Sequence, residues 1–415
     1  MRSKSLFAVA ALFFILLTSL VSPRWGFFGH RRINRMAVFT LPPDLIGLYK
    51  KNLEYVTEHA VDPDKRRYAT RHEAVRHYID IDHWDTYPFS KVPRDWTEAL
   101  MKYTSIHVVN ELGDTLVLTP DPLPKKGESE NYFSLRRPDG QLAWSISKGH
   151  YERFFRNNIL NQYYEDDWLV PCDSFRVLLG QYGQGLDCQA VFAKDHFSEY
   201  GILPFHLPVM QNRLTTAFRQ KNINQILRLS AEIGHYIGDA HVPLHTTENY
   251  NGQLTDQLGI HAFWESRLPE LYADKTYDFF VGKATYIEDP KSYFWKIVLD
   301  SHVLLDSVLQ IEKELSQTFP PDQQFCFEER LDATVRTQCP AYCAAYHDRM
   351  AGMVEKRMQD AILAIGSAWF TAWVDAGQPA FNLLRASKPS RGELAEMEAL
   401  EREYNAGAVK GRKHE

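Results

Sequence analysis

Apolar residues recur every three or four positions through most of this chain, which is the spacing of an amphipathic α-helix. The clearest stretches are residues 45–56, 214–241, 293–316 and 342–376. Strand-like alternation is scarce, and residues 109–118 are one candidate, as a short hairpin. Residues 119–140 are rich in Pro, Lys, Glu and Gly, which is typical of a long surface loop. We therefore predict an all-α fold: a single multi-helix domain, without internal repeats, that carries an insertion.

Both ends of the chain depart from this pattern. Residues 1–24 combine basic Arg2 and Lys4 with an almost wholly apolar run at 6–21, and small or turn-forming residues follow. This layout is typical of a secretory signal peptide; the alternative is an uncleaved anchor helix, for which the run is slightly short. We expect an exported, periplasmic or secreted protein with no membrane span after signal removal. The charged residues 386–415 are expected to form a frayed helix or a disordered tail.

The composition is that of a globular protein with a large core, since 44% of the 415 residues are hydrophobic and 24% are charged. Without residues 1–24 the chain has 44 basic residues, three fewer than the full 47, against 53 acidic ones, a net charge of −9. An acidic protein gains no general attraction for nucleic acid or anionic lipid. Such a substrate would need a local positive site, which a metal cluster can supply.

The cysteines and histidines limit the kinds of metal site that are possible. An exported chain can form disulfides, and Cys172 can pair with Cys188, as can two of Cys326, Cys339 and Cys343. A zinc site at Cys339 and Cys343 would lack a second cysteine pair. Because 16 histidines stand against 5 cysteines, a bound metal would have His and carboxylate ligands.

The strongest local motif is His235-Tyr-Ile-Gly-Asp239-Ala-His241-Val-Pro-Leu-His245. His235 and Asp239 are four residues apart, so they share a face of the predicted helix. His261 and Glu265 repeat that spacing further on. An ordinary capped or surface-paired histidine explains one such pair, but two pairs with a histidine between them favour a metal site whose ligand spacing is fixed by helices.

Two more clusters precede these motifs. Residues 61–64 read Val-Asp-Pro-Asp and are followed by His77-Tyr-Ile-Asp-Ile-Asp. Residues 25–30 read Trp-Gly-Phe-Phe-Gly-His, directly after the predicted signal. Together, the order and spacing of the five motifs resemble those of the zinc-dependent phospholipase C and single-strand-specific nuclease superfamily, whose members are mostly helical trinuclear zinc phosphodiesterases. The resemblance covers residues 25 to about 269, and we expect helices to about 378 to complete the domain.

The resemblance implies a site with three zinc ions. Asp62, His77, His235 and Asp239 would hold the first, with Asp64 as the alternative to Asp62. His245, His261 and Glu265 would hold the second. Trp25, through its amine and carbonyl, would hold the third with His30 and the other oxygen of Asp239. Asp62 would also orient or deprotonate the attacking water, while Asp239 would bridge two ions; His241 is left out.

The sequence departs from this family in two places. Arg24 is a poor residue for signal peptidase, so a free Trp25 amine needs a second trimming step. The 158 residues from His77 to His235 exceed what the family core needs, so residues 84–204 contain a large insertion within a domain spanning 25–385. The insertion could form a lid, a wall that selects substrate, or a surface for a partner, but no obligate protein partner is evident.

The implied substrate is a phosphodiester of one of two kinds. The spacing from Trp25 to His30 and that from Asp62 to His77 resemble the nuclease branch. The resemblance implies that Tyr78 stacks on a base of the substrate and that Asp80 forms a hydrogen bond to the edge of that base. Lys65 or Arg66, or else Arg67, could contact the phosphate, or all three could be surface charges. Glu265 instead resembles the phospholipase branch. We expect a nuclease or 3′-nucleotidase; the alternatives are a phospholipase C and a non-catalytic zinc or phosphate-ligand binding protein.

Overall fold

The computed structural model describes residues 27–121, 131–330, 333–381 and 391–407. The predicted signal peptide and Trp25 lie outside these residues. The chain divides into two compact units, which we call the helical unit (residues 1–83 and 202–415) and the inserted unit (residues 84–201). The inserted unit begins at Trp84 and ends at Gly201, close to where the excess length of the sequence placed an insertion.

The helical unit is built from α-helices and one two-stranded sheet. Its first part holds α2 (Phe27–Ala37), α3 (Pro43–Lys51), α4 (Leu53–Glu58), α5 (Asp62–Arg66), α6 (Arg71–Ala74) and α7 (Ile81–Trp84), whose last residue belongs to the inserted unit. The second part holds α11 (Leu203–Arg219), α12 (Ile223–Ala240), α13 (Ile260–Ala262), α14 (Leu268–Tyr272), α15 (Pro290–Val303), α16 (Leu305–Thr318), β7 (Phe325–Arg330), β8 (Ala333–Gln338), α17 (Pro340–Arg349), α18 (Met353–Asp375) and α19 (Arg391–Ala406).

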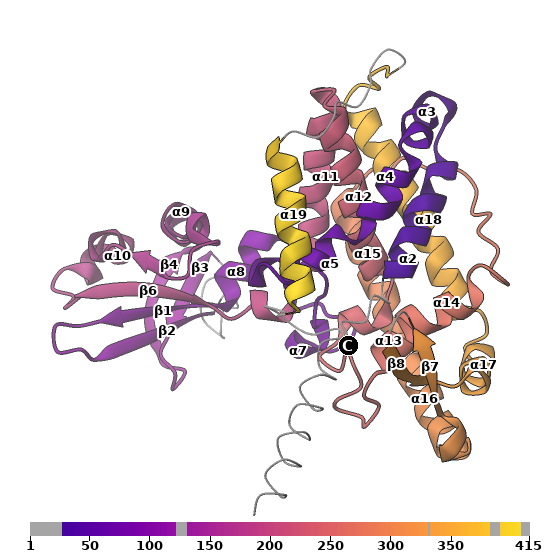
Figure 1. Cartoon of the computed structure of the whole chain (residues 1–415). Coiled ribbons are helices and arrows are strands. Elements are labelled where there is room, and N and C mark those ends of the chain that lie inside the picture. The colour runs from indigo at the N-terminus through magenta and orange to yellow at the C-terminus, as the bar shows by residue number, and fades with distance from the viewer. Residues whose placement is uncertain (1–26, 122–130, 331–332, 382–390, 408–415) are drawn as a thin grey trace, which may run out of the picture. The chain divides into compact units, whose positions relative to one another are not determined.

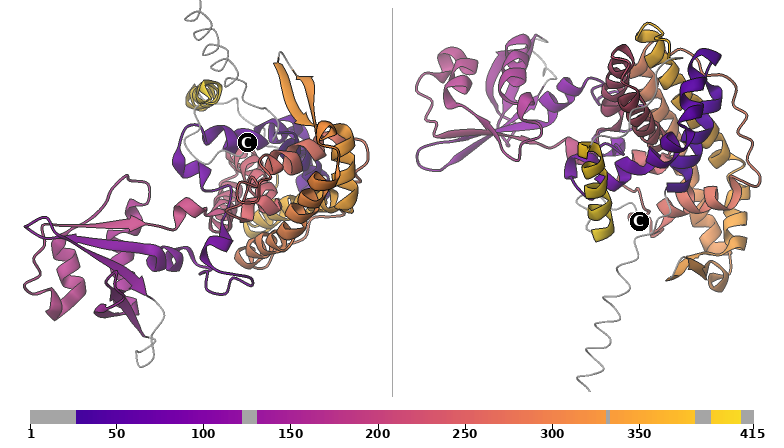
Figure 2. Two further views of the ribbon diagram at one scale, coloured as in Figure 1. Left: turned by 90° about the horizontal axis from the view of Figure 1, so that it is seen from below. Right: turned by 45° about the horizontal axis from the view of Figure 1, so that its top comes forward.

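The longest helices pack side by side around a common core. α11 contacts α12, α15 and α18, and α2 lies against both α12 and α18 (Figure 1, Figure 2). Trp369 of α18 is fully buried; its ring stacks on Tyr49 and its Nε1 donates to the carbonyl of Ser230. None of the helices in the described part of the chain combines the length and apolar character that a membrane span needs.

The predicted helical stretches are helical, but each is divided in two. The stretch at 214–241 breaks between α11 and α12, where Lys221 has a positive φ of 54° and the side chain of Asn222 caps α12. The stretch at 342–376 breaks between α17 and α18, where Ala351 and Gly352 have positive φ. A residue with positive φ ends a right-handed helix, and apolar periodicity alone does not reveal it.

The all-α prediction is wrong, because the protein contains two β-sheets. The larger lies in the inserted unit and has six antiparallel strands in the order β4-β3-β2-β1-β6-β5. Its strands are β1 (Thr104–Val109), β2 (Thr115–Asp121), β3 (Tyr132–Arg136), β4 (Leu142–Ser147), β5 (Trp168–Val170) and β6 (Ala190–Asp195). The predicted hairpin at 109–118 is real, since β1 pairs with β2 with Ile106 opposite Leu118. The predicted loop at 119–140, however, contains β3.

Helices cover one face of this sheet. α9 (Lys148–Asn158) and α10 (Cys172–Leu179) pack against it, and α8 (Trp96–Tyr103) leads into β1 (Figure 1). Tyr151 of α9 stacks on Phe133 of β3 with ring centroids 4.4 Å apart. Phe175 of α10 contacts Trp144 of β4 edge-on. The inserted unit therefore has its own apolar core.

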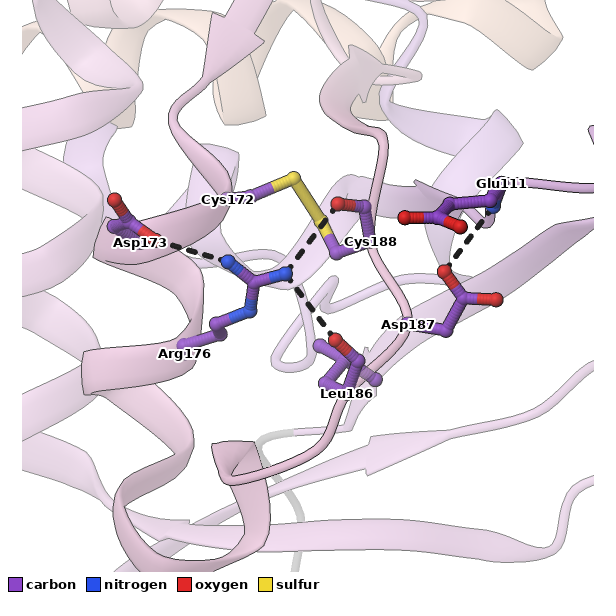
Figure 3. Close-up of a disulfide and its surroundings, with 7 residues drawn as sticks. All are labelled: Glu111, Cys172, Asp173, Arg176, Leu186, Asp187 and Cys188. Atoms are coloured by element: carbon purple, nitrogen blue, oxygen red, sulfur yellow. Dashed lines mark hydrogen bonds and ion pairs between the residues drawn. A yellow bond between two sulfur atoms is a disulfide. The ribbon is translucent and has the colours of Figure 1, made fainter.

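Each of the two units contains a disulfide of its own. Cys172 at the start of α10 is bonded to Cys188 in the loop before β6, and Arg176 donates to the carbonyls of Leu186 and Cys188 in that loop (Figure 3). In the helical unit Cys326 of β7 is bonded to Cys339, and Cys343 is a buried free thiol. Burial raises the pKa of the Cys343 thiol to about 11, so the group stays protonated near neutral pH.

Candidate metal centre

The second half of α12 supplies the two central side chains of the site. His235 and Asp239 are one helical turn apart on the same face, and both are buried. α12 ends at Ala240, and Pro243 begins the short turn that carries His245. The proline favours a new turn rather than continuation of the helix, so His245 returns toward the same region as His235.

Two glycines on α12 let α2 bring His30 against this face. A Cβ at Gly238 would lie 2.9 Å from Nδ1 of His30, and one at Gly234 would overlap the side chain of Asn34. Asn34 donates from Nδ2 to a backbone carbonyl of α12 at 3.0 Å, which holds the two helices at this separation. The rings of His30 and His235 therefore stack with their centroids 3.9 Å apart.

The first group of possible metal ligands is Asp64, His77 and His235, joined by Asp239. Nδ1 of His77 lies 3.0 Å from Nε2 of His235 and 2.9 Å from Oδ2 of Asp239. Oδ1 of Asp64 lies 3.7 Å from Nε2 of His235 and 3.8 Å from Nδ1 of His77. Two imidazoles and two carboxylates thus converge on one small space, as the ligands of a tetrahedral zinc ion do.

The second group is His245, His261 and Glu265. Oε2 of Glu265 lies 2.8 Å from Nε2 of His261 and 3.3 Å from Nε2 of His245. Glu265 belongs to a π-helical turn, Phe263–Arg267, between α13 and α14. Such turns are rare in proteins as a whole but frequent at functional sites. This one directs the Glu265 side chain toward His261, four residues earlier.

The third group contains His30, His235 and Asp239. Nε2 of His30 lies 3.4 Å from Oδ1 of Asp239 and 3.4 Å from Oε1 of Glu265. The two oxygens of Asp239 therefore face different groups, Oδ2 the first and Oδ1 the third, as a bridging carboxylate would. Trp25, the other residue predicted for this group, lies outside the described residues.

Three histidines of the site use Nδ1 in the same way, each against a backbone carbonyl oxygen: His235 with Ala60 at 2.8 Å, His245 with His77 at 2.6 Å, and His261 with Tyr250 at 3.1 Å. A carbonyl oxygen only accepts hydrogen bonds, so each Nδ1 carries the proton. In a neutral ring Nε2 is then left with a lone pair. Bonds of this kind behind the ring fix the orientation of histidines that ligate metals.

The charge state of these groups fits a bound cation. Burial lowers the pKa of His235 and holds that of His77 well below its ordinary value, so both rings are neutral near pH 7. The Nε2 lone pair of His235 then lies among carboxylate oxygens, which only accept, and beside Nδ1 of His77, whose nearest carboxylate oxygen, in Asp239, competes for the same hydrogen bond. Burial raises the pKa of Asp239 to about 7, because the buried carboxylate lacks enough positive charge nearby. A zinc ion among these atoms would remove both conflicts, and neutral imidazole with carboxylate is a usual zinc ligand set.

The structure does not bring Asp62 to the site and places Asp64 there instead. Oδ2 of Asp62 lies 2.6 Å from Nδ1 of His59, and its other oxygen lies 3.8 Å from the Lys65 ammonium. Both aspartates belong to α5, and residues two apart on a helix point to nearly opposite sides. Burial opposes ionisation of Asp64, but His235 and Arg67 outweigh it, so the Asp64 pKa lies below its usual value.

The three consecutive basic residues have three different surroundings. Lys65 pairs with Glu401 at 3.1 Å. Arg66 lies in a buried network, 2.7 Å from Glu232 and 3.3 Å from Glu73. Arg67 has its Nη1 3.2 Å from Oδ1 of Asp64, and its side chain is 9% exposed. Of the three, Arg67 is therefore the one beside the candidate ligands, a difference that three adjacent basic residues do not reveal by their order alone.

The two predicted base-binding residues are inside the protein. Tyr78 is 5% exposed and Asp80 is 6% exposed, so Tyr78 presents almost no surface in this structure. His241, which was left out of the ligand set, is also buried, and its Nδ1 donates to the carbonyl of Ile237 at 2.7 Å. It is not a member of any of the three groups found among the described residues.

Some functional candidates were missed from the sequence. The carbonyls behind the histidine rings leave no sequence signal, since any residue supplies a carbonyl. The Glu73–Arg66–Tyr236 network next to His77 was also missed; Glu73 precedes His77 by four residues and is 1% exposed in the structure. An acid four residues before a candidate ligand histidine was the available signal.

The comparisons with known proteins add no relative to this picture. The chain matches no protein-family description, and no curated protein is significantly similar to it.

Proposed function

We propose that this protein is a zinc-dependent hydrolase of phosphodiester and phosphate ester bonds, exported from the cytoplasm, with nucleic acid or nucleotides as the favoured substrate. One observation carries the proposal: eight buried or nearly buried side chains from separate segments converge as three adjoining ligand groups, which His235, Asp239 and Glu265 link to one another. The members are His30, Asp64, His77, His235, Asp239, His245, His261 and Glu265. The order of these residues is the order that the resemblance to the zinc phosphodiesterases implies.

The chemistry of the site follows from its donor set. Zinc ions held close together lower the pKa of a shared water and offset the charge that develops on phosphate oxygens during in-line attack. Asp64, whose pKa is lowered by His235 and Arg67 against the effect of burial, stays ionised and can accept a hydrogen bond from the attacking water. The resemblance to the zinc phosphodiesterases had implied this role for Asp62.

Arg67 supports a phosphate as the substrate group. Its Nη1 lies 3.2 Å from Oδ1 of Asp64, beside the ligand groups, and the planar fork of an arginine matches the oxygens of a phosphate. A cation at this point would bind the phosphate of the substrate and stabilise the negative charge of the transition state. No covalent nucleophile is required.

We expect three zinc ions per chain. The first two groups are complete within the described residues, with four and three ligands. The third needs Trp25, whose amine becomes a ligand only when it is the mature N-terminus. Purified protein that begins at Trp25 should contain about three zincs, and protein with a longer N-terminus about two.

The proposal is tested by metal content and hydrolysis together. The purified protein should carry zinc by mass spectrometry and should hydrolyse a chromogenic phosphodiester, and chelation should remove both properties. His235→Ala should lower both, because His235 belongs to two groups. Protein that carries no zinc, or a His235→Ala variant with full zinc and full activity, would contradict the proposal.

The substrate is tested with four compounds side by side: single-stranded DNA, RNA, a 3′-nucleotide and phosphatidylcholine. We expect hydrolysis of the nucleic acids or the nucleotide. Hydrolysis of phosphatidylcholine alone would make the protein a phospholipase C instead.

A further inference from the structure

The helix α19 lies along α5, the short helix that carries Asp64 (Figure 1). Two pairs of charges join α19 to the helical unit. Glu401 accepts from Lys65 at 3.1 Å, and Glu396 accepts from both terminal nitrogens of Arg228 at 2.9 and 3.2 Å. The helix is acidic overall, with five glutamates and two arginines.

Tyr404 of α19 inserts between two aromatic rings of the same unit. Its ring centroid lies 5.7 Å from that of Phe27 and 5.1 Å from that of Tyr68, and the residue is 5% exposed. Most of the other described side chains of α19 are exposed, except the half-buried Ala399 and Leu400, so Tyr404 and the two ion pairs are prominent among the contacts that hold the helix.

The surface beneath α19 adjoins the metal centre. Phe27 precedes His30 by one turn of α2, Lys65 follows Asp64, and Tyr68 follows Arg67. The covered surface, which we call the α19 seat, therefore consists of Phe27, Lys65, Tyr68 and Arg228. It offers two cations and two aromatic rings next to a centre that is otherwise buried.

We propose that the α19 seat binds single-stranded nucleic acid and that α19 is a displaceable acidic cover that occupies it in the free protein. The glutamates hold the cations that would bind phosphates, and Tyr404 lies where a base would stack on Phe27 or Tyr68. Alternating cations and aromatic rings are how single strands are bound without sequence preference. A membrane surface would instead need a contiguous apolar patch, which four residues with two charges do not make.

The hydrolysis of such a strand rests on the proposed function, but its binding to the seat does not. Exposed ion pairs contribute little to stability, so α19 can leave without unfolding the unit. Loosening α19 should then strengthen the binding of a strand. The same change should leave the hydrolysis of a small phosphodiester unaffected, because such a compound is too short to contact both the metal centre and the α19 seat.

The test is the affinity of the holoprotein for a short fluorescein-labelled phosphorothioate oligothymidylate, measured by anisotropy at constant salt. Tyr404→Ala removes the ring contact without changing charge, and Glu401→Gln removes the pair with Lys65. Glu398→Gln changes the charge of the same helix equally at an exposed position and is the matched control. We expect the first two variants to bind about threefold more tightly than the wild type, and Glu398→Gln to bind as the wild type does.

Two results would overturn the inference. One is that Tyr404→Ala and Glu401→Gln bind the strand no more tightly than Glu398→Gln. The other is that they gain affinity for phosphatidylcholine vesicles and not for the strand. The two variants could bind the strand more tightly although the protein does not hydrolyse bis(p-nitrophenyl) phosphate. That result would support the inference about the α19 seat and would overturn only the proposed function.

Discussion

Oδ1 of Asp64 lies 3.7 Å from Nε2 of His235, whereas Asp62, two residues earlier, is held at 2.6 Å by His59. The two aspartates flank Pro63 at the start of α5, so they have the same sequence context but opposite directions. The difference decides which carboxylate can bind a metal ion. It also gives an unusually well matched pair of variants.

Asp64→Asn should lose zinc from the first group and lower kcat/KM by at least about 10-fold, because changes around a metal ligand already cost 10- to 100-fold. Asp62→Asn removes the same charge from the same helix and should leave the zinc content and kcat/KM close to those of the wild type. Metal analysis and hydrolysis of a chromogenic phosphodiester measure both. The reverse ranking would mean that α5 is rotated from the arrangement described.

A second matched pair tests the close approach of α2 to α12. Gly234→Ala would drive a Cβ into the side chain of Asn34, so it should destabilise the protein by about 1–3 kcal/mol. Gly47→Ala in α3 meets nothing within 4 Å at an exposed position and should stabilise by about 0.5–1 kcal/mol. Urea unfolding measures both; if both substitutions stabilised the protein, the packing of α2 against α12 would be looser than described.

The candidate ligand groups that the structure brings together could largely be predicted from sequence, because helical spacing is local. His235 with Asp239, and His261 with Glu265, needed only the four-residue repeat. The choice of Asp64 over Asp62 could not be made in this way, since it depends on the phase of a five-residue helix set by its contacts. Arg67 likewise became distinct from Lys65 and Arg66 only through the positions of Asp64, Glu401 and Glu232.

The inserted sheet was missed for a related reason. Its strands are three to seven residues long, and the β3 register is set by pairing with β2 and β4 rather than by a local pattern. The polar residues Ser134 and Arg136 are buried there, which hides the alternation of apolar and polar positions. Apolar periodicity predicted that the four long stretches are helical, but it revealed neither the points at which each is divided nor the β7–β8 pair.

A third prediction concerns the buried network beside His77. Glu73 is 1% exposed and accepts from Arg66 at 3.3 Å, from Arg76 at 2.8 Å and from the hydroxyl of Tyr236. Glu73→Ala would leave Arg76 and the hydroxyl of Tyr236 without this partner and Arg66 with Glu232 alone, and should lower the free energy of unfolding by about 3 kcal/mol. Glu54→Ala, which removes an exposed partner of Arg35, should cost at most about 1 kcal/mol. Equal effects of the two substitutions in urea unfolding would show that the buried network stabilises the protein no more than the exposed pair does.

The last prediction uses the pH dependence of stability. Burial, together with Arg76 and Arg213, holds the pKa of His206 well below its ordinary value of 6.5, and the ring packs edge-on against Tyr236. Below pH 6.5 the unfolded chain therefore binds a proton at this residue that the folded chain does not. His206 thus lowers the free energy of unfolding as the pH falls from 6.5 toward its folded-state pKa, and adds no slope above pH 6.5.

His206→Gln removes this contribution, since glutamine does not titrate. In the presence of EDTA, the free energy of unfolding of the wild type should fall between pH 6 and 5 more steeply than that of His206→Gln, by up to about 1.4 kcal/mol per pH unit. Urea unfolding at pH 8, where both chains are neutral at this position, sets the reference for each protein. Parallel curves between pH 6 and 5 would mean that His206 takes up its proton in the folded protein as readily as in the unfolded chain.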